Sequence, residues 1–240
     1  MRFMIKYSEN DIPGWNAFLK DCEEQMRRDD DEFGIKSTPV PRAIICPKPD
    51  YCFVQMEPGP PPPDKEIKQG YNAFGDWHIN YCAYHYLCNC EFKYHVTDLS
   101  KGAMSYEDAK KKSTKRYKNW LPWLKEELKL LGYPKTIFAA SVKVYDSIKN
   151  EFKNVFPITN SSRSNRKLIA KAYNNIPKRD DCIPNEAEWK KFIEDLMEHC
   201  KWKPELIKTR SSMISEILND KWKSKLFAIY KSELENPKKR

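Results

Sequence analysis

Three polar residues follow predicted β-strands and are candidates for chemistry. Glu57 comes directly after the apolar run 52–54, and the Pro-Gly-Pro sequence behind it stiffens the turn. Asp98 ends another predicted strand, and Asn160 follows a further one. A carboxylate held where a strand gives way to a rigid turn projects into the crevice at the carboxyl end of a sheet, where open α/β folds place their chemistry. The alternative for Glu57 is an ordinary turn with a solvated side chain.

The elements that position these residues follow from hydrophobic periodicity. We predict strands at about 51–56, 94–99, 136–140 and 155–159. We predict helices at about 8–30, 77–88, 105–131 and 142–149, and a helical region at about 185–232. Segment 33–50 carries four prolines and is expected to be extended. Strands alternating with helices predict a four-stranded, mainly parallel sheet covered by helices on both faces.

The length of 240 residues fits one sizeable core with a helical appendage. We expect a single domain over residues 1–240. Its core covers about 45–170, with a helical lead-in at 1–44 and a helical C-terminal part at 180–240.

The composition favours a globular protein with a polyanionic partner. Lys and Arg exceed Asp and Glu by 43 to 34, a net charge of +9, although a basic surface can also serve solubility alone. The run 110–118 is strongly basic and is either a solvated face or a phosphate-contacting surface. The stripe formed by Trp120, Trp123, Leu124, Leu128 and Leu131 is expected to be core.

Location and metal content follow from other features. The sequence has no apolar run of about 18 residues or more and no signal-peptide core, so we expect a cytoplasmic protein without a membrane partner. The eight cysteines are then reduced by default. The tightest pair, Cys88 and Cys90, lacks a second pair at metal-site spacing, so no metal is expected. The histidines flank predicted elements without a triad and are assigned structural roles.

Several segments resemble the uracil-DNA glycosylase superfamily. Residues 55–60, Gln-Met-Glu-Pro-Gly-Pro, resemble the Gly-Met-Asn-Pro-Gly-Pro loop of its single-strand-selective branch, and 68–75 resembles the segment downstream of that loop, with one extra residue. Residues 96–101, Val-Thr-Asp-Leu-Ser-Lys, are similar to its Ile-Thr-Asn motif with the following apolar turn and Lys. Residues 160–165, Asn-Ser-Ser-Arg-Ser-Asn, stand where the family has His-Pro-Ser-Pro-Arg-Asn. The resemblance spans roughly 45–170.

This resemblance implies an α/β/α sandwich and a monofunctional, base-flipping DNA glycosylase without metal or other cofactor. Glycosidic cleavage creates an oxocarbenium-like sugar and an anionic leaving base, so negative charge is needed near C1′ and donors are needed on the base. Glu57, where some families of the group carry a catalytic Asp, is implied to orient water and stabilise the sugar cation. Asn160 replaces the family's His and offers pyrimidine O2 a neutral amide donor, but neither a proton nor a positive charge.

Asp98 stands where the family reads uracil with an Asn. An ionised Asp offers only acceptors, which suit the exocyclic N4 amine of cytosine and oppose O4 of uracil. Removal of normal cytosine would destroy the host genome, so the implied substrate is a 5-modified cytosine, hydroxymethylated or glucosylated, in anti-phage defence. Alternatively, a protonated Asp98 donates to O4, or Asp98 caps the following turn and never meets a base.

Further residues are assigned to base and DNA contacts by the resemblance. Gln55 and Met56 join Asp98 in base recognition, and Tyr71 or Phe74 stacks on the extruded base unless it belongs to the core. DNA contacts are assigned to Ser161, Ser162, Arg163, Ser164, Arg166, Lys167 and Lys101. Arg163 is the candidate that enters the base stack. The serines equally suit a helix cap or a turn. We expect a monomer that binds DNA.

Two other functions remain open. One is a uracil-DNA glycosylase of base excision repair, in which Asp98 is displaced or protonated. The other is a catalytically weak DNA-binding module, which Asn160 and the basic runs favour.

Overall fold

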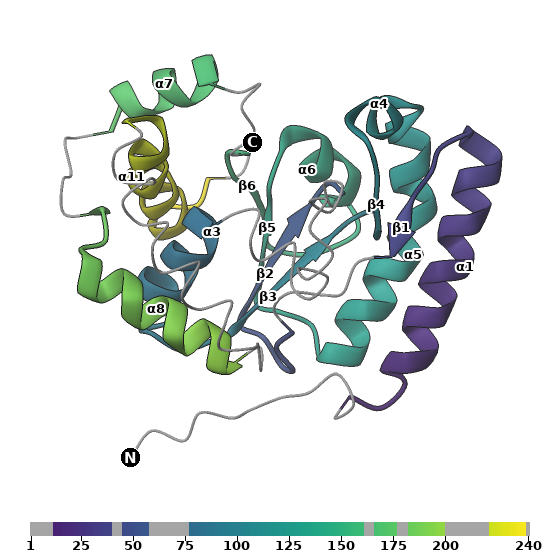
Figure 1. The fold of residues 1–240 in the computed structure, drawn as a ribbon, viewed down its shortest axis with the longest axis horizontal. Coiled ribbons are helices and arrows are strands. Elements are labelled where there is room, and N and C mark those ends of the chain that lie inside the picture. Colours follow the sequence, from purple (N-terminus) through teal and green to yellow (C-terminus); the bar gives the residue numbers. More distant parts are fainter. Residues whose placement is uncertain are drawn as a thin grey trace. The chain divides into compact units, whose positions relative to one another are not determined.

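β2 (Tyr51–Gln55) is an inner strand of a four-stranded sheet in the computed structural model (Figure 1). The strand order is β3-β2-β5-β6, where β3 is Tyr94–Asp98, β5 is Thr136–Ala139 and β6 is Val155–Pro157. Every neighbouring pair is parallel, and helices flank the sheet. The four predicted strands are confirmed. Their carboxyl ends meet at one edge of the sheet, because all four run in the same direction.

The structure describes residues 12–39, 45–57, 77–160, 166–176, 182–199 and 221–238. They divide into two compact units. The sheet unit comprises the described residues up to 57 together with 93–157, and the helical unit comprises 77–92 and the described residues from 158 onward. The sequence predicted one domain with its C-terminal helices as an extension. In the structure, residues 77–92 group with those helices instead.

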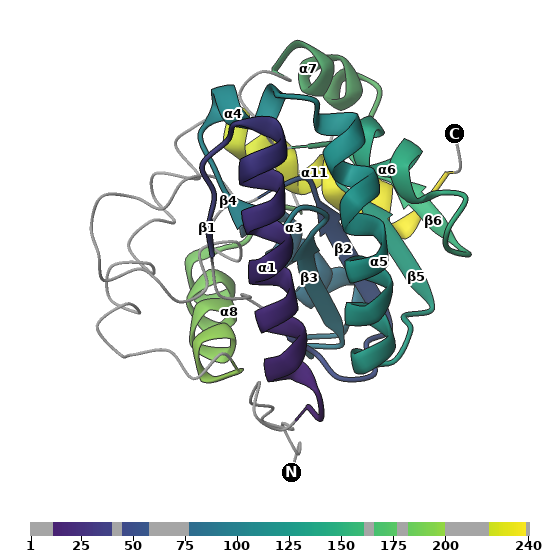
Figure 2. The same cartoon turned by 90° about the vertical axis from the view of Figure 1, so that its right-hand side faces the viewer.

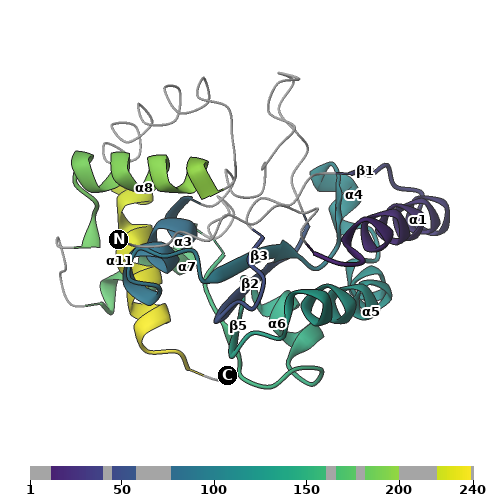
Figure 3. The same cartoon turned by 90° about the horizontal axis from the view of Figure 1, so that it is seen from below.

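Three helices cover one face of the sheet in the sheet unit. They are α1 (Trp15–Phe33), α5 (Ser113–Leu131) and α6 (Val142–Ile148), which lie on the same side of the strands (Figures 2 and 3). Alternate strand residues point to this face, because successive side chains of a strand point to opposite sides. The core includes Cys52, Val54, Ile137, Ala139, Trp15, Phe18, Trp120, Leu124, Leu128 and Leu131. The predicted stripe of α5 is therefore confirmed as core, with Trp123 only partly buried.

The opposite face of the sheet is aromatic at its centre. The Phe53 ring stacks on Phe138 with centroids 5.1 Å apart and meets Tyr94 edge-on at 5.9 Å. All three residues are buried. The strands therefore carry apolar residues on both faces, as expected for a buried parallel sheet.

A two-stranded antiparallel ladder was not predicted. β1 (Thr38–Pro39) pairs with β4 (Gly102–Ala103), where the sequence indicated an extended segment at 33–50 and no strand at 102–103. Gly102 allows this approach, because a Cβ atom there would lie 2.6 Å from the Cβ of Ser37. The chain then enters α4 (Tyr106–Lys110), whose cap residue Ser105 accepts a hydrogen bond from the Asp108 amide at 3.1 Å.

The helical unit is built around aromatic rings. It contains α3 (Trp77–Cys82) with the π-helical turn Ala83–Leu87, α7 (Arg166–Asn174), α8 (Glu186–His199) and α11 (Lys221–Glu235). The Tyr81 ring lies 5.5–5.9 Å from the rings of Trp189, Phe192 and Phe227, which joins α3, α8 and α11. No helix within the described residues is long and apolar enough to cross a lipid bilayer.

Candidate functional site

The ends of β2 and β3 place the first two candidate residues side by side. Gln55 and Asp98 are register partners, so their side chains leave the same face of the sheet. The pairing continues beyond the strands, because the amides of Leu99 and Ser100 donate to the carbonyls of Gln55 and Met56 at 2.8 and 2.9 Å. Glu57 follows directly. Asp98 is fully buried.

Glu57 is held by two donors from α5. Its Oε2 accepts from Nη2 of Arg116 at 3.1 Å and from the hydroxyl of Tyr117 at 2.5 Å. The Glu57 side chain is 11% exposed and that of Arg116 is fully buried. Glu57 is therefore not the solvated residue of an ordinary turn. Among the described residues, none donates a hydrogen bond to its Oε1.

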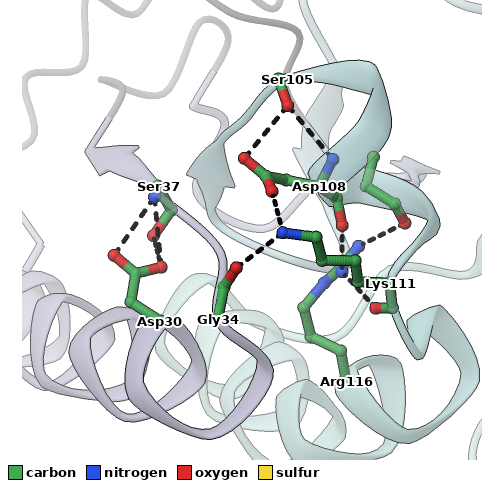
Figure 4. Close-up of polar contacts among 8 residues, drawn as sticks. Asp30, Gly34, Ser37, Ser105, Asp108, Lys111 and Arg116 are labelled. Carbon is green, nitrogen blue, oxygen red and sulfur yellow. Dashed lines mark hydrogen bonds and ion pairs between the residues drawn. The ribbon is translucent and has the colours of Figure 1, made fainter.

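Arg116 connects Glu57 to the turn between α4 and α5. Its Nη1 donates to the carbonyls of Asp108 and Lys111 at 3.4 and 3.1 Å, and its Nη2 donates to that of Ala109 at 3.1 Å (Figure 4). The planar guanidinium thus spans several fixed acceptors. Its positive charge compensates the Glu57 carboxylate, whose burial without a counterion would cost free energy.

The Tyr117 hydroxyl lies within electrostatic reach of two carboxylates. Burial raises its pKa most, and the charge and hydrogen bond of Glu57 raise it further, with a smaller contribution from the charge of Asp98. Charges act strongly over short distances in a buried site. Tyr117 therefore links the end of β2 to the end of β3.

A second buried group of polar residues lies under the same loops. Glu127 of α5 accepts from the Thr97 hydroxyl at 3.0 and 2.8 Å and forms an ion pair with Lys101. Nε2 of His95 lies 3.3 Å from the same carboxylate. Lys101 also donates to Thr97 and, at 2.5 Å, to the carbonyl of Asp98. The group fixes the turn that follows β3.

The assignment of Lys101 to DNA contact is corrected by this arrangement. Its side chain is 1% exposed, and its ammonium group is bound to Glu127, Thr97 and the Asp98 carbonyl. An ammonium group so placed cannot reach a phosphate at the surface. The nearby Cys52 thiol is also buried. Its burial and then the charge of Glu127 raise its pKa.

The basic run 110–118 is largely neutralised within the sheet unit. Lys110 pairs with Glu107 at 3.1 Å and Lys111 with Asp108 at 2.7 Å. Lys115 pairs with Glu32, and Arg116 pairs with Glu57 as described. The run is therefore partly paired with acidic residues, and its contact with phosphate stays a prediction. Lys112 and Lys118 are its exposed lysines without an ion pair to a described residue.

Other predicted site residues have varied positions. Gln55 is half-buried, and its Nε2 is buried without a hydrogen-bond partner among the described residues. Met56 is partly buried and packs against the core of the sheet unit. Tyr71 and Phe74 lie outside the described residues, as do Ser161, Ser162, Arg163 and Ser164.

Asn160 belongs to the helical unit, whereas Glu57 and Asp98 belong to the sheet unit. Asn160 is half-buried. α7 begins at Arg166, close to the predicted helix start, and Lys167 is exposed on it. The DNA contact of Lys167 stays a prediction.

Sequence reasoning missed Arg116, Tyr117 and Glu127. All three are buried on α5. A signal was present, because Arg116 and Glu127 stand four residues before and seven residues after Trp120, positions that share one helical face. Charged residues within an apolar stripe are buried only when they have partners. The surrounding lysines made Arg116 look like part of an exposed run.

Neither a model of a known protein family nor a curated protein sequence matches the chain. Within the described ranges, no group of three or more metal-ligating side chains is placed to hold an ion. The residues at the ends of β2 and β3 therefore define the candidate site.

Proposed function

We propose that the protein is a monofunctional DNA glycosylase that removes a flipped 5-modified cytosine, hydroxymethylated or glucosylated, and leaves an abasic site, in defence against phage DNA. The main supporting observation is the neighbourhood of Glu57 and Asp98. They stand at the ends of two adjacent parallel strands, and both act on the Tyr117 hydroxyl. One carboxylate is thus available for the sugar and one for the base.

Glu57 supplies the charge for the sugar side. Its Oε2 is bound by Arg116 and Tyr117, and no described residue donates to its Oε1. That oxygen can orient the attacking water and face the cation that develops at C1′. General base catalysis of this kind contributes typically about 10²–10⁴ in rate.

Asp98 and Gln55 supply contacts for the base side. Asp98 accepts from the N4 amine of cytosine, and the Gln55 amide offers a donor for the neighbouring N3. Uracil reverses both polarities, with a donor at N3 and an acceptor at O4. The register of the two residues places their side chains on one face, as this reading requires.

The burial of Asp98 gives specific support to a second candidate, a uracil-DNA glycosylase. Burial favours the uncharged form of a carboxyl group, and an uncharged Asp98 could donate to O4 of uracil. The two candidates differ only in the released base. One assay therefore separates them.

The test uses defined duplexes and single strands that carry one uracil, one 5-hydroxymethylcytosine or one glucosylated 5-hydroxymethylcytosine. Alkali-labile abasic sites are expected in the modified-cytosine substrates, with a loss of about 100-fold or more for Glu57→Gln. Glu126→Gln, a change of an exposed Glu on α5, is the matched control. Release of uracil alone would support the second candidate, and no release from any substrate would leave a DNA-binding role.

Asp98→Asn tests the base contact. The amide offers a donor where the carboxylate offers only acceptors, so the preference should move toward uracil by a factor of about 10–100. The ratio of single-turnover rates on the two bases measures it. An unchanged ratio would mean that Asp98 does not contact the base.

A further inference from the structure

We propose that Arg116 and Tyr117 are positioning residues, which hold the Glu57 carboxylate with one oxygen fixed and the other directed to the reaction. This inference rests on the proposed function, because it concerns how Glu57 would act there. It adds two residues of α5 for which the resemblance gives no role.

The Arg116 guanidinium is itself held by the backbone. It is fully buried, and three backbone carbonyls at the α4–α5 turn accept its hydrogen bonds at 3.1–3.4 Å (Figure 4). Glu57 is its only ion-pair partner among the described residues. Because its guanidinium is bound to the backbone, Arg116 holds the Oε2 atom of Glu57 in one position.

The Tyr117 hydroxyl completes the constraint. Its oxygen lies 2.5 Å from Oε2, the same atom that Arg116 contacts. Two donors that meet on one oxygen from successive residues of a helix fix the plane of the carboxylate as well as its position. The raised pKa of Tyr117 keeps the hydroxyl protonated, so it remains a donor throughout the neutral range.

The charge balance also suits the reaction. Arg116 places a positive charge beside Glu57, and its contact is confined to Oε2. Oε1 thus keeps negative charge for the developing sugar cation, as electrostatic catalysis by a preorganised group requires. A bond that only braced the turn would affect the stability of the fold, whereas a bond that positions the carboxylate affects the rate of base release in the folded protein. The single-turnover rate constant at saturating substrate, measured beside thermal stability, distinguishes the two roles.

The experiment compares Tyr117→Phe with Tyr145→Phe, which removes the hydroxyl of another buried tyrosine of the same core. Single-turnover base release at saturating substrate is followed on the best substrate of the wild type. Tyr117→Phe should lower the rate constant by roughly 10- to 100-fold, the effect of one hydrogen bond to a charged group, with substrate affinity unchanged. Tyr145→Phe should match the wild type.

Arg116→Lys is the second variant. It keeps a positive charge but lacks the planar fork, so it should also lower the rate constant without changing substrate affinity. Thermal unfolding identifies any variant that fails to fold. A wild type that releases base while both folded variants keep its rate constant would overturn this inference alone. A wild type that releases no base from any substrate would overturn the proposed function and this inference with it.

Discussion

Buried charges in the sheet unit occur in partnered groups. Glu57 meets Arg116, and Glu127 meets Lys101. Such pairs add little net stability, because desolvation offsets their attraction. Their value lies in geometry, since each one fixes a loop at the end of a strand. Removing a single partner leaves the other charge buried and uncompensated.

Glu127→Gln should therefore destabilise the protein by about 3–5 kcal/mol, because Lys101 keeps its buried charge without a counterion. Urea unfolding at neutral pH measures the change. The control, Glu126→Gln on the solvent-facing side of the same helix, should remain within about 0.5 kcal/mol of the wild type. Equal effects of the two substitutions would show that the Lys101–Glu127 pair is not buried as described.

The raised pKa of Asp29 predicts that the unfolding free energy of the protein depends on pH. Burial raises its pKa, although Gln25 and Trp120 donate to its oxygens at 2.9 and 2.6 Å. Because the folded pKa lies above that of the unfolded chain, the contribution of Asp29 is complete below the ordinary value of 3.8 and is lost as the pH rises through the folded value. The stability of the wild type relative to Asp29→Asn should thus fall as the pH rises above 3.8. A constant difference in unfolding free energy would contradict this.

At the scale of elements, the alternation of strands with helices and the helical spacing of apolar residues predicted the features that depend on residues close in sequence. The four strands and the core face of α5 could be read from single stretches, as could the positions of Glu57 and Asp98. The pairing of β1 with β4 could not, because two short strands far apart in sequence carry no local signal. Arg116 and Tyr117 were missed for a related reason. Their partner Glu57 comes from a distant segment, and only the folded chain distinguishes a buried arginine from exposed lysines beside it.

The β1–β4 ladder makes its own prediction. Gly102→Ala should destabilise the protein by about 1–3 kcal/mol, because the added Cβ would meet Ser37 at 2.6 Å and the Met26 sulfur at 2.9 Å. Combination with Ser37→Gly removes the nearer atom, so the double variant should lose less stability than the two single changes together. Strict additivity in urea unfolding would mean that the strands can separate without cost.

For the whole molecule, the net charge of +9 predicts salt-sensitive binding to DNA. Each phosphate contact that is made contributes about −0.9 to the slope of log affinity against log salt. Lys118→Gln should weaken binding and reduce that slope, because Lys118 is exposed without a described ion pair. Lys115→Gln should have less effect, since Glu32 already neutralises Lys115. Fluorescence anisotropy with a labelled duplex measures both, and identical slopes for the two variants would show that neither lysine meets a phosphate.

The contact of α3 with α11 has a consequence for synthesis on the ribosome. The ring centroids of His78 and Tyr81 lie 4.8 and 5.5 Å from that of Phe227, and the Cys82 thiol donates to its carbonyl at 3.6 Å. α3 leaves the exit tunnel long before Phe227 does, so its aromatic face has no native cover while most of the chain is being made. The nascent protein should therefore be a client of chaperones that recognise aromatic segments. A stalled chain without α11 should be degraded faster than the finished protein.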